Sequence, residues 1–321
     1  MGIHLSRTVN TDQWAGLVAG NGKATFFHGP EWSELLASAL DGLEALHLSA
    51  RADGKLVGVL PLIRQLRGPI SALDSLTYGT YGGPVVDPSA PPETAGLLVS
   101  EFAALAGSPM VAHAQIVDRF GVLESTPSSG SRVIEDAVQV VSLDRDYEQL
   151  KSSFRPSCRN KVRKARRAGV AVRRAETRED FLAYWSLLAV KTRRWNVRPA
   201  IGARFFSAMS ELSPDLVQMW HAVHDGDLIA GDLNFVRNGI IMNWGNVTAE
   251  GAQKFAPANL LHATAIEEGV REGERVYDLG GSAGIEGVHA FKASFGAEDV
   301  PIRRFVIDKG WYRAVRSLTR R

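Results

Sequence analysis

The feature of this 321-residue chain that most constrains its fold is a short internal repeat. Residues 50–62 read ARADGKLVGVLPL, and residues 222–234, about half the chain further on, read AVHDGDLIAGDLN. Each segment predicts a β-hairpin, with a strand, an Asp-Gly turn and a return strand that carries an apolar face. An apolar face of this kind needs a helix to cover it. The repeat therefore predicts a duplicated α/β unit.

Turn residues and apolar spacing predict helices and strands in both halves of the chain, so we expect an α/β fold with mixed sheets. Helices are expected at 30–40, 93–106, 147–168 (broken near Pro156 and stopped by Gly169), 177–191, 202–212 and 257–269. Strands are expected at 46–50, 55–63, 137–143, 170–173, 217–223, 228–236, 240–247, 275–279 and 301–307. A polar loop at 124–132 and a change of charge near 145–150 predict two domains, 1–145 and 146–321.

Charge is distributed unequally between the two halves. Residues 1–150 hold 9 Lys or Arg and 17 Asp or Glu, whereas residues 151–321 hold 28 and 18. Between Lys151 and Arg174 there are ten basic residues and no acidic one. Such an asymmetry indicates that the second half meets an anionic partner, and phosphate, nucleic acid and an acidic cofactor are all candidates.

The composition also narrows the setting in which the protein works. A single cysteine, Cys158, excludes intrachain disulfides, so we expect a reducing, cytoplasmic location. Cys158 lies in the basic run, which is expected to lower its pKa, although a tolerated small residue is the simpler interpretation. No long apolar run or secretory signal is present, so no membrane span is expected. The eight histidines lack metal-site spacing, and no metal is expected.

Three blocks of sequence resemble one known family. The first block lies in the first half and consists of EWSELL, DGKLVGVLPL and SLTYGTYGGP. The second is SCRNKVRKARRAGVAV at 157–172, and the third is DLGGSAGIEGVHAFKASFG at 278–296. In this order they resemble the FemAB-like branch of the GNAT acyltransferase superfamily, which includes the Fem peptidyltransferases and cellulose-synthesis-type GNAT proteins. The resemblance implies two tandem GNAT-like domains packed side by side, with the reaction centre involving the second.

The resemblance also implies a catalytic lysine within the FKASFG block. Lys292 would stabilise the negative charge that develops on the acyl oxygen, or else bind a carrier phosphate. A surface lysine between two core phenylalanines is the alternative. Asp278 lies near the end of a predicted strand and is a candidate base or amine anchor, with turn capping as the other interpretation. Gly280 and Gly281 would let a ligand approach the backbone closely.

The basic helix is the candidate binding element for a phosphate-bearing donor. On a helix its cations share neighbouring faces, and an anionic partner would relieve their repulsion. A solvated helix face is the alternative. The candidate donor-binding residues are Arg159, Lys161, Arg163, Lys164, Arg166, Arg167, Arg194 and Trp195. Trp195 would stack a base or a ribose, unless it is a core residue.

A further group of residues is expected to line the acceptor or acyl pocket. They are Tyr78, Tyr81, Asn234, Asn243, Trp244, Asn259, Gly280, Gly281, Ser282 and Phe291. The asparagines are included because a polar side chain on a half-buried strand must find a partner. For the two tyrosines a structural turn is the commoner explanation.

These observations favour an enzyme that transfers an aminoacyl group from aminoacyl-tRNA to a small-molecule or peptide amine. An acyl-CoA-dependent N-acyltransferase is the second hypothesis. It is weakened because Gln253 has no Gly-x-Gly behind it and Pro257 offers no N–H to a pyrophosphate. A non-catalytic module that binds RNA or another polyanion is the third. No bound cofactor is expected, and the oligomeric state stays open.

Overall fold

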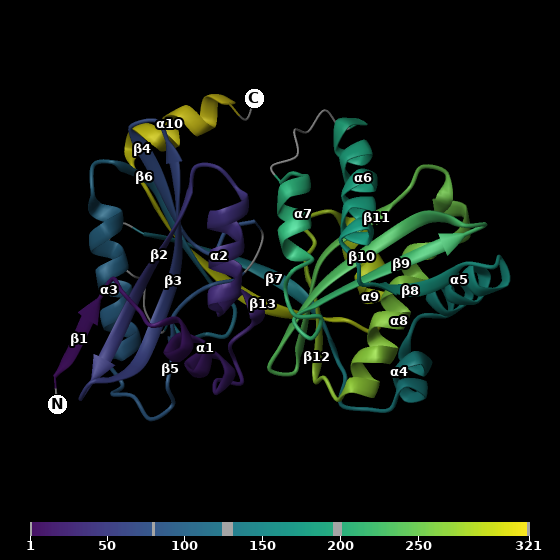
Figure 1. Ribbon diagram of the computed structural model, residues 1–321, viewed down its shortest axis with the longest axis horizontal. Helices are drawn as coiled ribbons and strands as arrows, with labels where there is room; N and C mark the ends of the chain where they lie inside the picture. The colour runs from purple at the N-terminus through teal and green to yellow at the C-terminus, as the bar shows by residue number, and fades with distance from the viewer. Residues whose placement is uncertain (1, 79–80, 124–130, 195–200, 320–321) are drawn as a thin grey trace. The chain divides into compact units, whose positions relative to one another are not determined.

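The computed structural model describes residues 2–78, 81–123, 131–194 and 201–319, and it divides into two units. Unit 1 comprises Met1–Asp136 and Pro301–Arg321, and unit 2 comprises Ala137–Val300 (Figure 1). The division differs from the predicted boundary at 145, because the last strand of the chain belongs to unit 1. None of the helices within the described ranges is long and apolar enough to cross a membrane.

Unit 1 is a mixed sheet with helices on both of its faces. Its strand order is β1 (Ile3–Ser6), β2 (Leu43–Ala52), β3 (Lys55–Arg67), β4 (Ile70–Ser75), β6 (Val111–Asp118) and β13 (Glu298–Asp308), with β5 (Val85–Val86) paired to β3. The helices are α1 (Thr11–Ala19), α2 (Pro30–Ala39), α3 (Thr94–Gly107) and α10 (Gly310–Thr319), with a 3-10 turn at Phe26–His28. Neighbouring residues of a strand point to opposite faces of the sheet. Val59 of β3 accordingly packs in a cluster with Trp14 of α1 on one face, and Leu60 packs in a cluster with Leu98 of α3 on the other.

Unit 2 repeats this plan with its own six strands. The order is β7 (Arg132–Ser142), β12 (Val276–Gly281), β11 (Ile240–Thr248), β10 (Asp227–Arg237), β9 (Val217–His224) and β8 (Ala171–Ala175). The helices are α4 (Tyr147–Ser153), α5 (Pro156–Arg167), α6 (Arg178–Arg194), α7 (Ala203–Met209), α8 (Pro257–Glu272) and α9 (Glu286–Ala293), with a 3-10 turn at Ala252–Phe255. In each unit, two parallel strands are connected through a helix. In unit 1, α3 lies between β4 and β6 in the chain, and in unit 2, α8 lies between β11 and β12.

Three predicted hairpin turns hold the sheets in register. Asp53, Asp225 and Asn238 have φ values of 48°, 52° and 53°, and the glycine after each also has a positive φ. Two consecutive positive φ angles match the twist of the flanking strands, which is why Asp-Gly and Asn-Gly are favoured there. The duplicated hairpins predicted from the repeat are therefore confirmed as β2–β3 and β9–β10.

Two strands pair away from the unit that precedes them in the sequence. The strand after β6 in the chain, β7, pairs with β12 in unit 2. The strand after β12, β13, pairs with β6 in unit 1 through Arg303–Asp308. Phe305 of β13 is buried in the core of unit 1. Because β13 pairs with β6, residues 301–321 belong to unit 1, although the sequence predicted them in the second domain.

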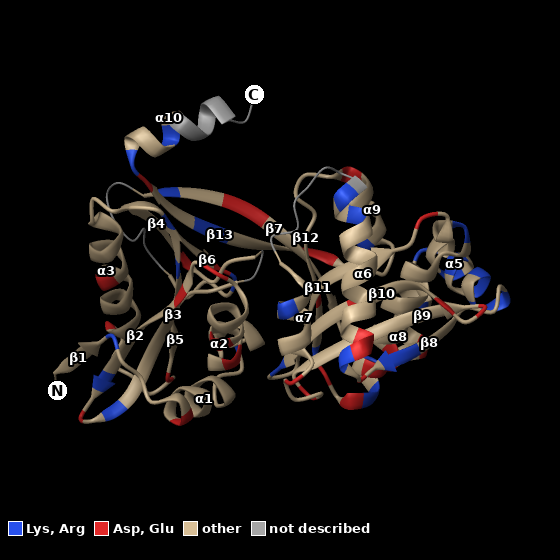
Figure 2. Ribbon diagram, turned by 45° about the horizontal axis from the view of Figure 1, so that its top comes forward, with Lys and Arg blue, Asp and Glu red and all other residues tan. Residues whose placement is uncertain are grey.

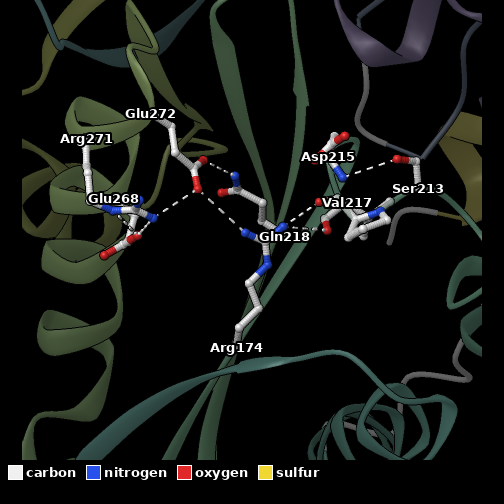
Figure 3. Close-up of polar contacts among 9 residues, drawn as sticks. Arg174, Ser213, Asp215, Val217, Gln218, Glu268, Arg271 and Glu272 are labelled. Carbon is white, nitrogen blue, oxygen red and sulfur yellow. Dashed lines mark hydrogen bonds and ion pairs between the residues drawn. The ribbon is translucent and has the colours of Figure 1, made fainter.

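A polar cluster fastens the edge of the unit 2 sheet to α8 (Figure 3). Glu272, at the end of α8, accepts a hydrogen bond from Gln218 Nε2 of β9 at 2.8 Å and lies 3.8 Å from Arg174 Nη1 of β8. Arg174 also donates to the carbonyls of Pro214 and Val217, which lead into β9. The cluster therefore joins the end of α8 to strands β8 and β9.

Candidate active site

The candidate site lies where two parallel strands of unit 2 part. β11 and β12 pair only through Ile240–Met242 and Val276–Asp278. Beyond this point β11 continues to Thr248 against β10, and Gly281 of β12 pairs with Val138 of β7. Residues 243–246 of β11 are partly exposed, although the strand is buried on either side of them. Beyond Met242, this part of β11 therefore no longer pairs with β12.

The end of β12 is a tight turn that faces β11. Gly280 has a φ of 71°, and a Cβ added there would lie 3.9 Å from the Asn243 carbonyl oxygen. The Asp278 carboxylate accepts a hydrogen bond from the Gly280 amide at 2.8 Å and is 1% exposed. Asp278 therefore caps this turn, which was one of its two predicted roles.

Lys292 is bound to the same turn. Its Nζ donates to the Gly280 carbonyl at 3.0 Å and to the Gly281 carbonyl at 2.7 Å, and the residue is 9% exposed. Burial lowers the pKa of Lys292 from 10.5 to about 8, and the nearby Asp278 partly opposes this shift. An ammonium has three N–H donors, so one is left after the two carbonyls. The structure thus places a partly desolvated cation beside Gly280 and Gly281.

β7 supports the turn from the opposite side. The Ser282 hydroxyl donates to Gln139 Oε1 at 2.8 Å, and Gln139 Nε2 donates to the His289 carbonyl of α9 at 3.1 Å. Gln139 is 2% exposed. One buried amide therefore connects the loop after β12 with the helix that carries Lys292.

A buried carboxylate that the sequence analysis did not select organises the other side of the site. Asp232 on β10 is 0% exposed. Its Oδ1 accepts from Asn243 Nδ2 at 2.9 Å and from Asn246 Nδ2 at 3.1 Å. Its Oδ2 accepts from Asn234 Nδ2 at 3.0 Å and from the Tyr277 hydroxyl at 3.4 Å. The spacing of Asp232 and Asn234, two residues apart on a strand, was the signal that could have identified it.

A β-bulge gathers the two asparagines of β11 on the Asp232 side. Asn243 pairs with Asn234, whereas Asn246 pairs with Asp232, so the register shifts by one residue at Trp244. Residues three apart on a regular strand point to opposite faces, and one extra residue brings them back to the same face. Trp244 itself packs with Phe205 and Phe235 at ring-centroid distances of 6.0 and 6.1 Å.

Helices on both faces complete the surroundings of Asp232. The Tyr277 hydroxyl lies 2.7 Å from Nδ1 of His262 on α8. Burial lowers the pKa of His262, and burial together with the Asp232 charge raises the pKa of Tyr277. On the opposite face Tyr184 of α6 packs so closely that a Cβ added at Gly231 would lie 2.5 Å from its ring. The network is therefore held rigidly between two helices.

Several predicted pocket residues have other partners. Asn259 is 5% exposed and donates to Cys158 Sγ at 3.7 Å, joining α8 to α5. Phe291 packs against His262 and Phe295, with ring centroids 5.5 and 5.3 Å away. The structure thus brings together Asn234, Asn243, Gly280, Gly281, Ser282, Asp278 and Lys292, and it places Asn259, Trp244 and Phe291 in the packing around them.

The expectation of a lowered cysteine pKa is wrong. Cys158 is 1% exposed, and burial raises the pKa of its thiol. The charges of Lys161 and Arg159 oppose this shift but are weaker than desolvation. Cys158 belongs to the buried face of α5 together with Val162 and Ala165.

The two predicted tyrosines belong to unit 1. Tyr81 is 4% exposed, with the Arg119 guanidinium 5.9 Å from its ring centroid. Tyr78 is partly buried and has a φ of 66°, and burial raises its pKa. A Cβ added at Gly82 would lie 2.1 Å from the Ser75 carbonyl oxygen, so the backbone at Gly82 packs closely against Ser75.

Lys and Arg residues are concentrated on α5 in unit 2 (Figure 2). Lys161, Arg163, Lys164, Arg166 and Arg167 are exposed, and Arg159 is partly buried. Arg159 donates to the Ser152 and Phe154 carbonyls, and Arg166 lies 3.5 Å from Glu267. Lys161, Lys164 and Arg167 form no ion pair with any residue that the structure describes. Trp195 and the Arg194 side chain lie outside the described residues.

Comparisons with known proteins agree with this architecture. Residues 152–293 match the family model described as an acetyltransferase (GNAT) domain, while no curated protein matches the chain. The structure of FemX is similar with a TM-score of 0.73, at 15% identity, over 99% of both chains.

Two further solved structures share the fold. A tandem GNAT protein from the clavulanic acid biosynthesis pathway has a TM-score of 0.57 and 17% identity, over 96% of this chain and 98% of its own. L-PGS from Bacillus licheniformis has a TM-score of 0.57 and 14% identity, over 88% and 92%. The predicted resemblance to the FemAB-like branch is thereby confirmed at the level of the fold. Residues 152–293 thus match a GNAT domain, and the whole chain shares its fold with these solved structures.

Proposed function

Because this chain carries a GNAT acyltransferase domain within a FemX-like tandem fold, we propose that it transfers an aminoacyl group from aminoacyl-tRNA to an amine. The reaction breaks the ester bond of the donor and forms an amide bond with the acceptor. An ester of this kind is already activated, so the protein needs to bind, orient and stabilise charge.

The observation that carries the proposal is the exposed cationic face of α5. Six basic residues and no acidic residue lie within Pro156–Arg167, and among the described residues only Arg166 of these six forms an ion pair, with Glu267. Like charges at helical spacing repel one another, and a polyphosphate partner relieves this repulsion. A folded RNA presents such a partner over a wide surface.

Lys292 is the proposed catalytic cation. As the acceptor amine attacks the ester carbonyl, a tetrahedral intermediate with a negatively charged oxygen forms. The third N–H of Lys292 would donate to this oxygen, while the Gly280 and Gly281 carbonyls hold the ammonium in position. A partly desolvated ammonium interacts more strongly with such charge than a solvated one.

Acyl-CoA is the second candidate donor, and the acetyltransferase family match favours it. Against it stands the start of α8, the helix that follows β11. Ala256 precedes the helix with a φ of 56°, and Pro257 at its first position has no N–H. The backbone donors with which a helix N-terminus binds pyrophosphate are therefore reduced.

The test is to assay the purified protein with charged tRNA and with acyl-CoA side by side. The proposal predicts amide product that forms only with charged tRNA and is abolished by RNase. Release of free CoA, detected with a thiol reagent, would instead support the second donor. Binding of tRNA without product, unaffected by Lys292→Ala but lost on charge reversal of Arg163 and Arg167, would support a non-catalytic module.

A further inference from the structure

We propose that Asn243 and Asn246, oriented by Asp232, form a paired hydrogen-bond acceptor for a primary amine. This inference rests on the proposed function for its reaction context, because the substrates of aminoacyl transfer include such amines. Asp232 acts here as a positioning residue, and the two asparagines contact the ligand.

The orientation of the two side-chain amides follows from their contacts with the carboxylate. An amide has a donor end and an acceptor end, and only the donor end can face a carboxylate favourably. Both N–H groups of Asn243 are used, since its Nδ2 donates to Asp232 Oδ1 and to Asn234 Oδ1, each at 2.9 Å. Asn246 Nδ2 donates to the same Asp232 oxygen at 3.1 Å. The Oδ1 atoms of both residues are thereby turned away from Asp232.

The two asparagines lie on the part of β11 that no longer pairs with β12. Asn243 and Asn246 are partly exposed, and no donor among the described residues reaches either Oδ1. Asn243 also lies next to Gly280, the residue whose carbonyl accepts from Lys292. A ligand that reaches the Lys292 turn therefore meets outward-facing acceptors on β11.

The chemistry of the two oxygens selects the ligand class. Neutral amide oxygens accept hydrogen bonds but do not take up a proton, so they would repel a phosphate or carboxylate and suit a group with two or more N–H bonds. A primary amine fits this requirement. Gripping it by its N–H bonds leaves the nitrogen lone pair of a neutral amine free for attack.

The bulge at Trp244 brings the Asn243 and Asn246 side chains to the same face of the sheet. Without the extra residue, Asn243 and Asn246 would lie on opposite faces of the sheet. Bulges beside functional sites commonly redirect a side chain in this way. The carboxylate has four acceptor contacts, and the network beyond it is buried, so the arrangement is rigid.

Nuclear magnetic resonance of the full chain with ¹⁵N-labelled asparagine tests the orientation directly. We expect the side-chain amide protons of Asn243 and Asn246 to exchange slowly with water, and Asp232→Asn to accelerate this exchange at least tenfold. Adding alaninamide should shift these resonances, whereas N-acetylalaninamide, which has no free amine, should not. Fast exchange in the wild type, or equal shifts with both probes, would overturn the inference.

A matched pair of variants separates the site from general destabilisation. Asn246→Leu removes one acceptor at a partly exposed position and should weaken alaninamide binding about tenfold, the effect of one lost hydrogen bond. Gln218→Met removes a buried amide on neighbouring β9, bound to Glu272 rather than Asp232, and should leave the affinity unchanged. Unchanged affinity in Asn246→Leu would also refute the pair.

Binding of charged tRNA distinguishes the two sources of the amine. If the amine belongs to the donor, N-acetylation of alanyl-tRNA should weaken its binding to the wild type but not to Asn246→Leu. If it belongs to the acceptor, N-acetylation should have no effect, and alaninamide should still bind beside saturating N-acetyl-alanyl-tRNA. Failure of the proposed function would appear separately, as absent tRNA binding with alaninamide binding intact.

Discussion

At the residue scale, the most informative side chain is Lys292. The resemblance implied a catalytic lysine within the FKASFG block, and the structure shows that the Lys292 ammonium is bound by the Gly280 and Gly281 carbonyls. Its environment is a balance in which burial lowers the pKa to about 8 while Asp278 opposes the shift. The protonation of Lys292 is thus sensitive to pH just above neutrality.

We expect activity to fall as pH rises through about 8, because the oxyanion role needs the charged form. Lys292→Met should lower kcat by about 10²–10³-fold, as loss of an oxyanion donor does, and should remove this alkaline decline. The pH profile of kcat/KM in wild type and variant checks both points. Equal profiles in the two proteins would rule out the role.

The lowered pKa of Lys292 affects the stability of the protein in the opposite direction to its activity, so the pH dependence of stability and that of activity can be told apart. The native pKa of Lys292 lies below its unfolded value of 10.5, so between pH 8 and 10.5 the unfolded chain binds more protons. The contribution of this group therefore makes the native state more stable as pH rises through that window. A loss of activity near pH 8 accordingly cannot be attributed to unfolding caused by Lys292.

A second prediction concerns the close approach of Gly231 to Tyr184. A Cβ at position 231 would lie 2.5 Å from the Tyr184 ring, which is buried and cannot move freely. Gly231→Ala should therefore destabilise the protein by about 1–3 kcal/mol in urea unfolding. Gly16→Ala is the control, because a Cβ there meets nothing within 4 Å and lies in helix α1, where alanine is favoured over glycine.

At the scale of elements, the sequence predicted those whose signals are local. The three positive-φ hairpin turns, the helix that begins at Pro257 and the break of the basic helix before Pro156 all appeared where expected. Strands β4 and β6 and helix α9 were not predicted. The bulge at Trp244 was not foreseen either, because register depends on the partner strand. Asp232 was missed for the same reason, since its role depends on side chains from β11 and β12.

Helix α5 is the element whose charge we expect to govern donor binding. Lys164→Gln should weaken binding of charged tRNA several-fold and lower the slope of log affinity against log salt by about 1. Lys164 is exposed and forms no ion pair with a described residue, so its loss should not affect folding. Filter-binding titrations at several salt concentrations measure both effects.

Lys23→Gln supplies the comparison, because Lys23 is also an exposed lysine but belongs to unit 1 rather than to α5 of unit 2. It removes the same charge and should leave affinity and salt slope unchanged. An equal loss in both variants would show that net charge, rather than the α5 face, attracts the RNA.

At the scale of the whole molecule, the repeat correctly predicted duplication but could not predict how strands are shared. β13 lies beyond unit 2 in sequence yet completes the sheet of unit 1. No local pattern identifies the partner of a strand, since pairing is decided by which edge remains open. The compact units divide after Asp136 and again after Val300, whereas the sequence predicted one boundary at 145.

Truncation tests the importance of this return strand. A chain that ends at Val300 lacks the part of β13 that pairs with β6, including the buried Phe305. We expect it to aggregate or to lose the cooperative unfolding of unit 1, because an open strand edge and an uncovered core remain. A chain that ends at Lys309 loses α10 but keeps β13, and it should unfold cooperatively. Similar behaviour of both truncations would contradict the assignment.

The position of β13 has a consequence for biosynthesis. While the ribosome makes the chain from its N-terminus, the first unit emerges early but must wait, with its β6 edge open, until translation has passed through the entire second unit. The second unit is continuous from Ala137 to Val300 and can complete its own contacts sooner. The half that is synthesised first is thus the half that matures last, and during that interval it is the natural client of a chaperone.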